Sequence, residues 1–196
     1  MSKTVKFTDW LYEILTLHFR WVVYLFKGFI VLGFFPATSA VFAVVRDRIL
    51  NKDIASLPQA FKQYYHENFR AANILGWLFT FITGIVILNL FLIPYYPEAM
   101  HLLMYAIIAF TSFILVISWI YLFPTIVHFQ LPIKELFLVI LKTGFSSIPA
   151  IVIQIIAMMI ILLISLRFLA FFILFGVTPY ALIQMSFSLR LFKRFQ

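Results

Sequence analysis

AANILGWLFTFITGIVILNLFLIPYYP, the stretch from residue 71 to residue 97, lies between Arg70 and Glu98 and contains no charged side chain. The hydrocarbon core of a bilayer is about 30 Å thick, and a helix that rises about 1.5 Å per residue crosses it with roughly 20 apolar residues. A transmembrane β-strand needs only about 10 residues and alternates in polarity. The stretch therefore predicts a membrane-crossing helix.

Uncharged runs of the same character recur along the chain, and 64% of its residues are apolar while only 11% are charged. A soluble domain carries about 25% charged residues, so a water-soluble globule is excluded. We predict an all-α fold, a polytopic membrane helix bundle that forms a single domain over residues 1–196. Its approximately five transmembrane helices are expected at residues 21–45, 73–93, 100–127, 143–166 and 168–189.

Two shorter amphipathic helices are expected at the membrane surface. Residues 7–20 place Trp10, Leu11, Ile14 and Leu15 on one side, which predicts an interfacial helix that leads into the first span. A cleaved signal peptide is the alternative, but Lys27 interrupts the apolar region that such a peptide needs. The proline at position 36 leaves open whether the first span is straight, kinked or re-entrant.

Residues 56–72 predict the second amphipathic helix, in the longest loop. Ser56 is the expected N-cap, and apolar side chains recur at helical spacing between charged ones. The helix is expected to pack on its own bundle, or to lie against the inner membrane face or a partner. As a third function we considered a lipid sensor that presents the basic loop from Arg46 to Arg70 to anionic head groups.

Basic residues predict the orientation, because Lys and Arg favour the cytoplasmic side of short loops. With five spans the basic loops 46–70 and 134–142 and the tail 190–194 share one side. We therefore expect a bacterial plasma-membrane protein with its C-terminus in the cytoplasm and its N-terminus outside. Lys3 and Lys6 argue against the outside N-terminus.

Residues with catalytic or ligand-binding patterns are scarce. There is no cysteine, the four histidines show no metal-ligand spacing, and the spans contain no acidic residue that could carry a coupling charge. We expect no enzyme, no cofactor, no metal and no nucleic-acid partner. Pro36, Pro124 and Pro179 interrupt predicted spans, either as structural kinks or as unwound centres of a transport site.

The run Gly33, Pro36, Ala37, Thr38, Ala40, Phe42, Arg46 and Phe61, followed by Asn68 to Gly76, resembles the YesL-like integral membrane proteins of Gram-positive bacteria. The resemblance implies a multi-span plan and no established activity. It also implies a genomic neighbourhood, because such proteins are often encoded beside ABC importers for oligosaccharides.

We therefore expect an accessory or regulatory membrane subunit that associates with membrane lipid and with the permease subunits of a carbohydrate ABC importer. The alternative is a self-contained small-solute transporter or channel that uses the proline-broken helices, which would require a homo-oligomer. The expected partner-binding residues form a small-residue face and an amphipathic face: Gly33, Pro36, Ala37, Thr38, Ser39 and Ala40 on the first, and Phe61, Tyr64, Tyr65, Asn68, Phe69, Arg70 and Asn73 on the second.

Overall fold

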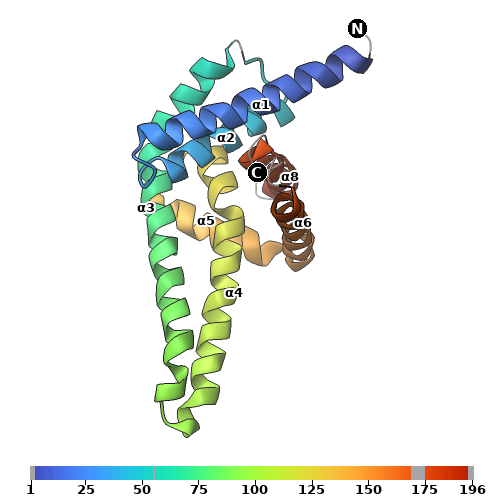
Figure 1. Ribbon diagram of the computed structural model, residues 1–196. Helices are drawn as coiled ribbons and strands as arrows, with labels where there is room; N and C mark the ends of the chain where they lie inside the picture. The colour runs from blue at the N-terminus through green and yellow to red at the C-terminus, as the bar shows by residue number, and fades with distance from the viewer. Residues whose placement is uncertain (1–2, 55, 169–174, 194–196) are drawn as a thin grey trace.

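The computed structural model describes residues 3–54, 56–168 and 175–193 (Figure 1). As expected, the described chain is helical throughout and contains no strand. Its elements in chain order are α1 (Lys3–Lys27), α2 (Phe34–Ile49), α3 (Leu57–Leu92), the short 3-10 helix η1 (Ile93–Tyr95), α4 (Glu98–His128), α5 (Ile133–Ser146), α6 (Ile148–Arg167) and α8 (Val177–Phe192).

Helix α2 lies at the centre of the molecule and packs against α1, α3, α4 and α8. Its small residues Ala37, Ala40 and Ala43 are completely buried, because side chains of this size let neighbouring helices approach closely. Between them, Phe42 packs with its ring centre 5.3 Å from that of Phe123 on α4 and 5.6 Å from that of Tyr180 on α8. The small-residue face therefore has its neighbours within this chain.

The expected first span, residues 21–45, is wrong as one continuous crossing. Helix α1 ends at Lys27, a turn follows, and α2 begins at Phe34 and folds back along α1. Glu13 of α1 forms an ion pair with Arg48 at the end of α2, so these two residues lie at the same level instead of at opposite ends of one span. The side on which the N-terminus lies stays a prediction.

Two glycines make this turn sterically feasible. A Cβ atom at Gly28 would overlap the backbone of Gly33, and one at Gly33 would overlap the carbonyl of Leu25. Between the two glycines, Phe29 and Ile30 adopt left-handed backbone conformations with φ of 54° and 63°. A β-branched residue rarely adopts this conformation, so the turn holds strain that the surrounding packing must offset.

Helix α3 joins two elements that the sequence separates. The amphipathic helix expected at 56–72 and the span expected at 73–93 form one helix of 36 residues, because no proline lies between Pro58 and Pro94. The helix starts directly after Ser56, as predicted, with Pro58 in its first turn, although no side-chain capping hydrogen bond is present there.

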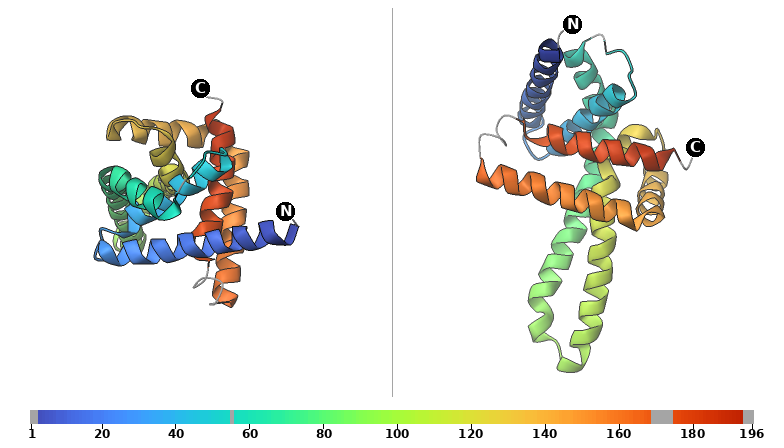
Figure 2. Two further views of the ribbon diagram at one scale, coloured as in Figure 1. Left: turned by 90° about the horizontal axis from the view of Figure 1, so that it is seen from above. Right: turned by 90° about the vertical axis from the view of Figure 1, so that its right-hand side faces the viewer.

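Helices α3 and α4 form a long hairpin whose distal half projects beyond the other helices (Figure 1). The other two views show that α6 and α8 lie across this hairpin instead of alongside it (Figure 2). Helix α6 begins at Ile148, after a break at Ser147 and before Pro149, so the span expected at 143–166 starts five residues late. The span expected at 168–189 includes residues outside the described part, and its described portion is α8.

Three helical segments of the described chain are long and apolar enough to cross a membrane: Leu57–Tyr95, Glu98–His128 and Ile148–Arg167. A membrane helix bundle is therefore confirmed. The count of five crossings stays a prediction, since α2 and α8 have 16 residues each, about 24 Å of helix.

Proline and amide side chains connect the helices. Pro124 has no N–H to donate to the Ile120 carbonyl one turn earlier in α4, and Gln184 Nε2 of α8 donates to that carbonyl instead. Gln154 Nε2 of α6 donates to the Tyr121 hydroxyl of α4 over 2.9 Å. Pro36 and Pro179 are the third residues of α2 and α8, where N–H groups lack helical partners anyway, so neither proline breaks a helix.

Candidate functional site

The small-residue part of the expected partner surface is inside the molecule. Pro36, Ala37, Thr38, Ser39 and Ala40 are all buried. Thr38 Oγ1 accepts a hydrogen bond of 3.0 Å from Trp21 Nε1 of α1 and donates one of 2.8 Å to the Phe34 carbonyl. These residues hold α1 and α2 together and do not offer a surface to another protein. The expectation of a partner surface there is wrong.

The amphipathic part of the expected surface is divided between the core and the outside. Phe61 and Tyr65 are buried, with ring centres 5.1 and 4.9 Å from that of Tyr24 on α1. Asn73 Nδ2 donates to the carbonyl of Leu32 in the α1–α2 turn over 3.1 Å. Three of the predicted residues therefore fasten α3 to its own bundle.

The other four predicted residues of this helix, together with Gly33 of the first face, have different surroundings. Tyr64 and Asn68 line a polar pocket, Phe69 is half-buried and Arg70 is exposed. Gly33 is buried in the α1–α2 turn.

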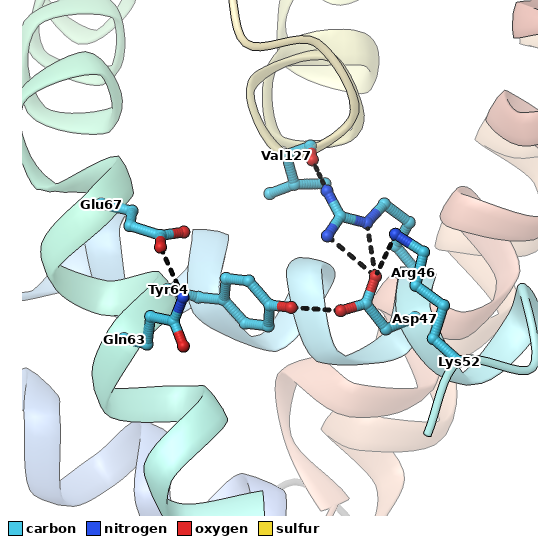
Figure 3. Close-up of polar contacts among 7 residues, drawn as sticks. All are labelled: Arg46, Asp47, Lys52, Gln63, Tyr64, Glu67 and Val127. Carbon is cyan, nitrogen blue, oxygen red and sulfur yellow. Dashed lines mark hydrogen bonds and ion pairs between the residues drawn. The ribbon is translucent and has the colours of Figure 1, made fainter. Parts of the chain in front are cut away.

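The polar residues of the site gather around Asp47, at the end of α2 (Figure 3). Its carboxylate is only 3% exposed and pairs with the Arg46 guanidinium at 2.8 Å and with Lys52 Nζ at 3.5 Å. The Tyr64 hydroxyl of α3 donates to the other carboxylate oxygen. Arg46 also donates to the Val127 carbonyl in the last turn of α4. The cluster therefore ties α2, α3 and α4 together at one end of the hairpin.

Tyr64 belongs to the charged first part of α3, residues 57–72, which precedes the apolar section. Burial, together with its hydrogen bond to Asp47, raises the pKa of the Tyr64 hydroxyl to about 12. The hydroxyl therefore stays protonated and keeps donating to Asp47 throughout the physiological range. This hydrogen bond is one of the connections that hold α3 against α2.

A pocket of about 430 Å³ opens beside this cluster, between α2, α3, α4 and the segment that leads to α5. Its wall combines Arg46, Tyr64, Glu67, Asn68 and Gln130 with apolar residues such as Leu136. It thus offers both hydrogen-bond donors and acceptors, which suits a polar segment of another molecule. Among the described residues no group of three or more metal-ligating side chains lies close together.

The sequence did not single out Arg46, Asp47 or Gln130 as site residues. In the sequence, Arg46 belongs to the basic loop that predicts the orientation. A signal is present, because Arg46 and Asp47 follow a run of residues that is apolar enough to be buried, and buried charges need partners. The ion-pair partners of Asp47, Arg46 and Lys52, are close in sequence, whereas the Tyr64 hydroxyl comes from 17 positions away.

A second exposed feature lies on the distal part of α3. Trp77, Phe81, Gly84, Leu88 and Phe91 recur at alternating spacings of four and three residues, so they share one helix face. Phe81, Leu88 and Phe91 are 68%, 57% and 73% exposed, and a Cβ atom at Gly84 would meet nothing within 4 Å. We call these five residues the hairpin face. It has a notch at its centre, and at its proximal end the Trp77 ring packs on the Phe35 ring of α2, with ring centres 5.4 Å apart.

Comparison with known proteins confirms the resemblance to the YesL-like family. Residues 14–90, which include the α1–α2 turn, the Asp47 cluster and most of α3, match the family described as "Protein of unknown function, DUF624". The chain is similar to three proteins of Bacillus subtilis (strain 168) that bear the description uncharacterized. It is 33% identical to YteU over 66% of this chain and 58% of YteU, 25% identical to YesV over 59% and 55%, and 27% identical to YesL over 74% and 68%.

The chain thus spans a little over half of the length of YteU and YesV. No solved structure matches it. The matched family segment contains α2 together with parts of α1 and α3, while α4, α5, α6 and α8 lie outside that segment.

Proposed function

We propose that the protein is an accessory membrane subunit that binds another membrane protein within the bilayer through the hairpin face. The single observation that carries the proposal is the projection of the distal α3–α4 hairpin beyond the rest of the molecule, with the hairpin face exposed along it (Figure 1). Two helices alone enclose no pathway, so this part of the molecule is suited to contact and not to conduction.

The form of the hairpin face supports a helix as the occupant. Residues that repeat every seven positions form the seam along which two helices pack side by side. Glycine at a helix centre costs about 1 kcal/mol relative to alanine, and no contact inside this chain requires Gly84. A neighbouring membrane helix would use the notch, because small residues let helix backbones approach closely.

The polar pocket beside Asp47 supplies a second contact in this proposal. It lies at the opposite end of the hairpin from the η1 turn, among the basic residues that predict the cytoplasmic side. A partner that packs along the hairpin face would bring its own cytoplasmic loop near this pocket. We assign the pocket to such a polar loop.

The choice of partner rests on the family resemblance, which implies proximity to oligosaccharide importers. We therefore propose the permease subunits of a carbohydrate ABC importer. The orientation that goes with this proposal has the C-terminus in the cytoplasm. It revises the expected N-terminal side, because the contact between Glu13 and Arg48 favours an N-terminal helix on the same side as the basic loop.

Site-specific cross-linking in native membranes tests the proposal, and the absence of cysteine from the sequence makes single-cysteine variants simple to build. We expect Leu88→Cys on the hairpin face to cross-link to permease subunits that mass spectrometry identifies. Leu163→Cys, an equally exposed leucine on α6, is the matched control and should give no such product. If both variants capture the same proteins at the same yield, or Leu88→Cys captures only its own copy, the proposal is overturned.

The transporter alternative keeps one proline-interrupted helix, because Pro124 lies inside α4 while Pro36 and Pro179 lie in the first turns of α2 and α8. Proteoliposomes that contain only this protein distinguish the two functions. An accessory subunit leaves the vesicles impermeable to oligosaccharides and other small solutes, whereas solute uptake by the protein alone would favour the transporter.

A further inference from the structure

A second pocket, of about 480 Å³, lies between the α1–α2 turn and the first part of α3. Lys27, Lys62 and His66 contribute two ammonium groups and an imidazole to it, and no carboxylate is among its lining residues. Tyr24 and Tyr65 form aromatic parts of its wall, and Phe29 is an apolar part. Cationic and apolar groups therefore line the same pocket.

The charges of this pocket differ from Arg46, Arg48 and Lys52, which lie near the same end of the molecule. Arg46, Arg48 and Lys52 all pair with carboxylates of the chain. Within the described part of the chain, neither Lys27 nor Lys62 forms an ion pair, and Lys27 Nζ instead lies 4.6 Å from the centre of the Tyr24 ring. Like charges that line one pocket repel each other unless an anion lies between them. The pocket thus has the electrostatic character of an anion site.

The turn beside these cations is apolar and points outward. Phe29 is 86% exposed, and Ile30 and Val31 are also exposed. The N–H groups of residues 28–32 nevertheless all bond to carbonyls of residues 24–29, and Asn73 Nδ2 donates to the Leu32 carbonyl. Backbone with internally bonded amides enters hydrocarbon at low cost, whereas free N–H groups would prevent it. The turn is therefore equipped to contact lipid chains.

We infer that this pocket binds an anionic phospholipid, with the phosphate between Lys27, Lys62 and His66 and an acyl chain along Phe29 and Leu32. A free phosphate would use only the cationic part, and a neutral lipid only the apolar part. The anionic phospholipid uses both, and it is abundant in the cytoplasmic leaflet, which is the leaflet that the basic residues predict for this end of the molecule. The inference is independent of the proposed partner, which contacts the hairpin face.

Native mass spectrometry of the full-length, delipidated protein in detergent tests this assignment. Phosphatidylglycerol is the anionic probe and phosphatidylcholine the neutral one. We expect phosphatidylglycerol to bind in preference, and the double variant Lys27→Gln/Lys62→Gln to bind it roughly tenfold more weakly, because each cation near anionic lipid contributes to the attraction. The matched control is Arg70→Gln/Lys134→Gln, which removes the same charge from exposed positions outside the pocket and should bind as the natural protein does.

Two further arms separate the components of the site. Phe29→Ser should weaken phosphatidylglycerol binding while every charge is retained. Inorganic phosphate should not displace the lipid at concentrations far above that of the protein; displacement would show an anion site without a lipid chain and would overturn the assignment. Equal losses in the two double variants, or equal binding of both lipids, would overturn it as well. If the double variant does not fold, Lys62→Gln alone, which alters one exposed side chain, should also weaken phosphatidylglycerol binding.

Discussion

Pro124 leaves a backbone carbonyl without its helical hydrogen-bond donor, and Gln184 supplies a donor in its place. The proline frees the Ile120 carbonyl inside α4, and the amide of Gln184 on α8 donates to it across the helix interface. A buried carbonyl without a partner costs about 1–3 kcal/mol, so the amide stabilises the bundle chiefly by preventing that loss. The sequence shows an amide at position 184 within an apolar segment, but it does not reveal which carbonyl this amide will bond.

The first prediction is that the cost of Gln184→Leu depends on Pro124. In the natural background we expect the substitution to lower the free energy of unfolding by about 1–3 kcal/mol. In the Pro124→Ala background the new N–H bonds to Ile120, so the same substitution should cost clearly less. Thermal unfolding in detergent measures the cost of Gln184→Leu in both backgrounds. Gln154→Leu, which removes the bond to Tyr121, is the control whose cost should not depend on Pro124.

The second prediction concerns the Asp47 cluster. Asp47→Ala leaves the largely buried Arg46 guanidinium without its counter-charge, and loss of one partner from a buried pair costs about 3–5 kcal/mol. Tyr64→Phe removes a single hydrogen bond to a carboxylate and should cost about 1.5–3 kcal/mol. Unfolding midpoints in detergent measure both losses. Tyr12→Phe, at an exposed tyrosine, is the control, and an equal loss there would contradict the role given to Tyr64.

The same tyrosine sets a pH dependence. The pKa of Tyr64 is raised to about 12, above the usual value of 10, so the folded protein keeps a proton that the unfolded chain releases between these pH values. The stabilisation is therefore complete below pH 10 and is lost as the pH rises toward 12. Unfolding measured across this window should show a steeper loss of stability for the natural protein than for Tyr64→Phe, and parallel curves would contradict the shift.

At the scale of elements, the sequence predicted the helices of the long hairpin and misplaced their ends. The apolar run after Arg70 identifies a crossing because its length and composition are local properties. The sequence did not predict that residues 57–72 and this crossing form one helix, α3. The change from polar to apolar side chains looks like a boundary, although the helical backbone continues through it. The α1–α2 turn was missed because residues 28–34 are as apolar as a helix centre, and only the two glycines at its ends mark it.

Glycines on α3 give the fourth prediction, in which one helix contains both the test and its control. A Cβ atom at Gly76 would overlap the Phe35 ring of α2, so Gly76→Ala should destabilise the protein by about 1–3 kcal/mol through overpacking. Gly84 has open space around it, and Gly84→Ala should leave stability unchanged or raise it by up to about 1 kcal/mol. Unfolding midpoints in detergent would show the contrast, and a similar loss at both positions would contradict the packing described here.

At the scale of the whole molecule, the hairpin sets its two ends far apart, and both of its helices are long and apolar enough to cross a membrane. Tyr95 in the η1 turn and Lys52 after α2 lie at opposite ends of α3, whereas α1 folds back so that Tyr12 lies near the Lys52 end. The candidate site was only partly predictable at this scale. Helical spacing indicated Tyr64 and the family resemblance indicated Asn68, but the small-residue face proved to be interior, since sequence alone does not tell which helix will cover such a face.

This arrangement gives the fifth prediction, for single-cysteine variants labelled with a membrane-impermeant maleimide in intact cells and in inverted vesicles. Tyr12→Cys and Lys52→Cys should react from the same side, and Tyr95→Cys from the other. Phe29→Cys should react poorly from both sides, because the turn contacts lipid. Labelling of Tyr12→Cys together with Tyr95→Cys would contradict the fold of α1 along α2.

The bond between Gln184 and the Ile120 carbonyl also has a consequence for biogenesis. Ribosomes release α4 well before α8, and 64 residues separate the two bonded positions. During that interval the Ile120 carbonyl of α4 lacks its side-chain donor, and the residues of α2 that α8 later contacts are still uncovered. Synthesis of α8 thus supplies the donor that the Ile120 carbonyl lacks until then.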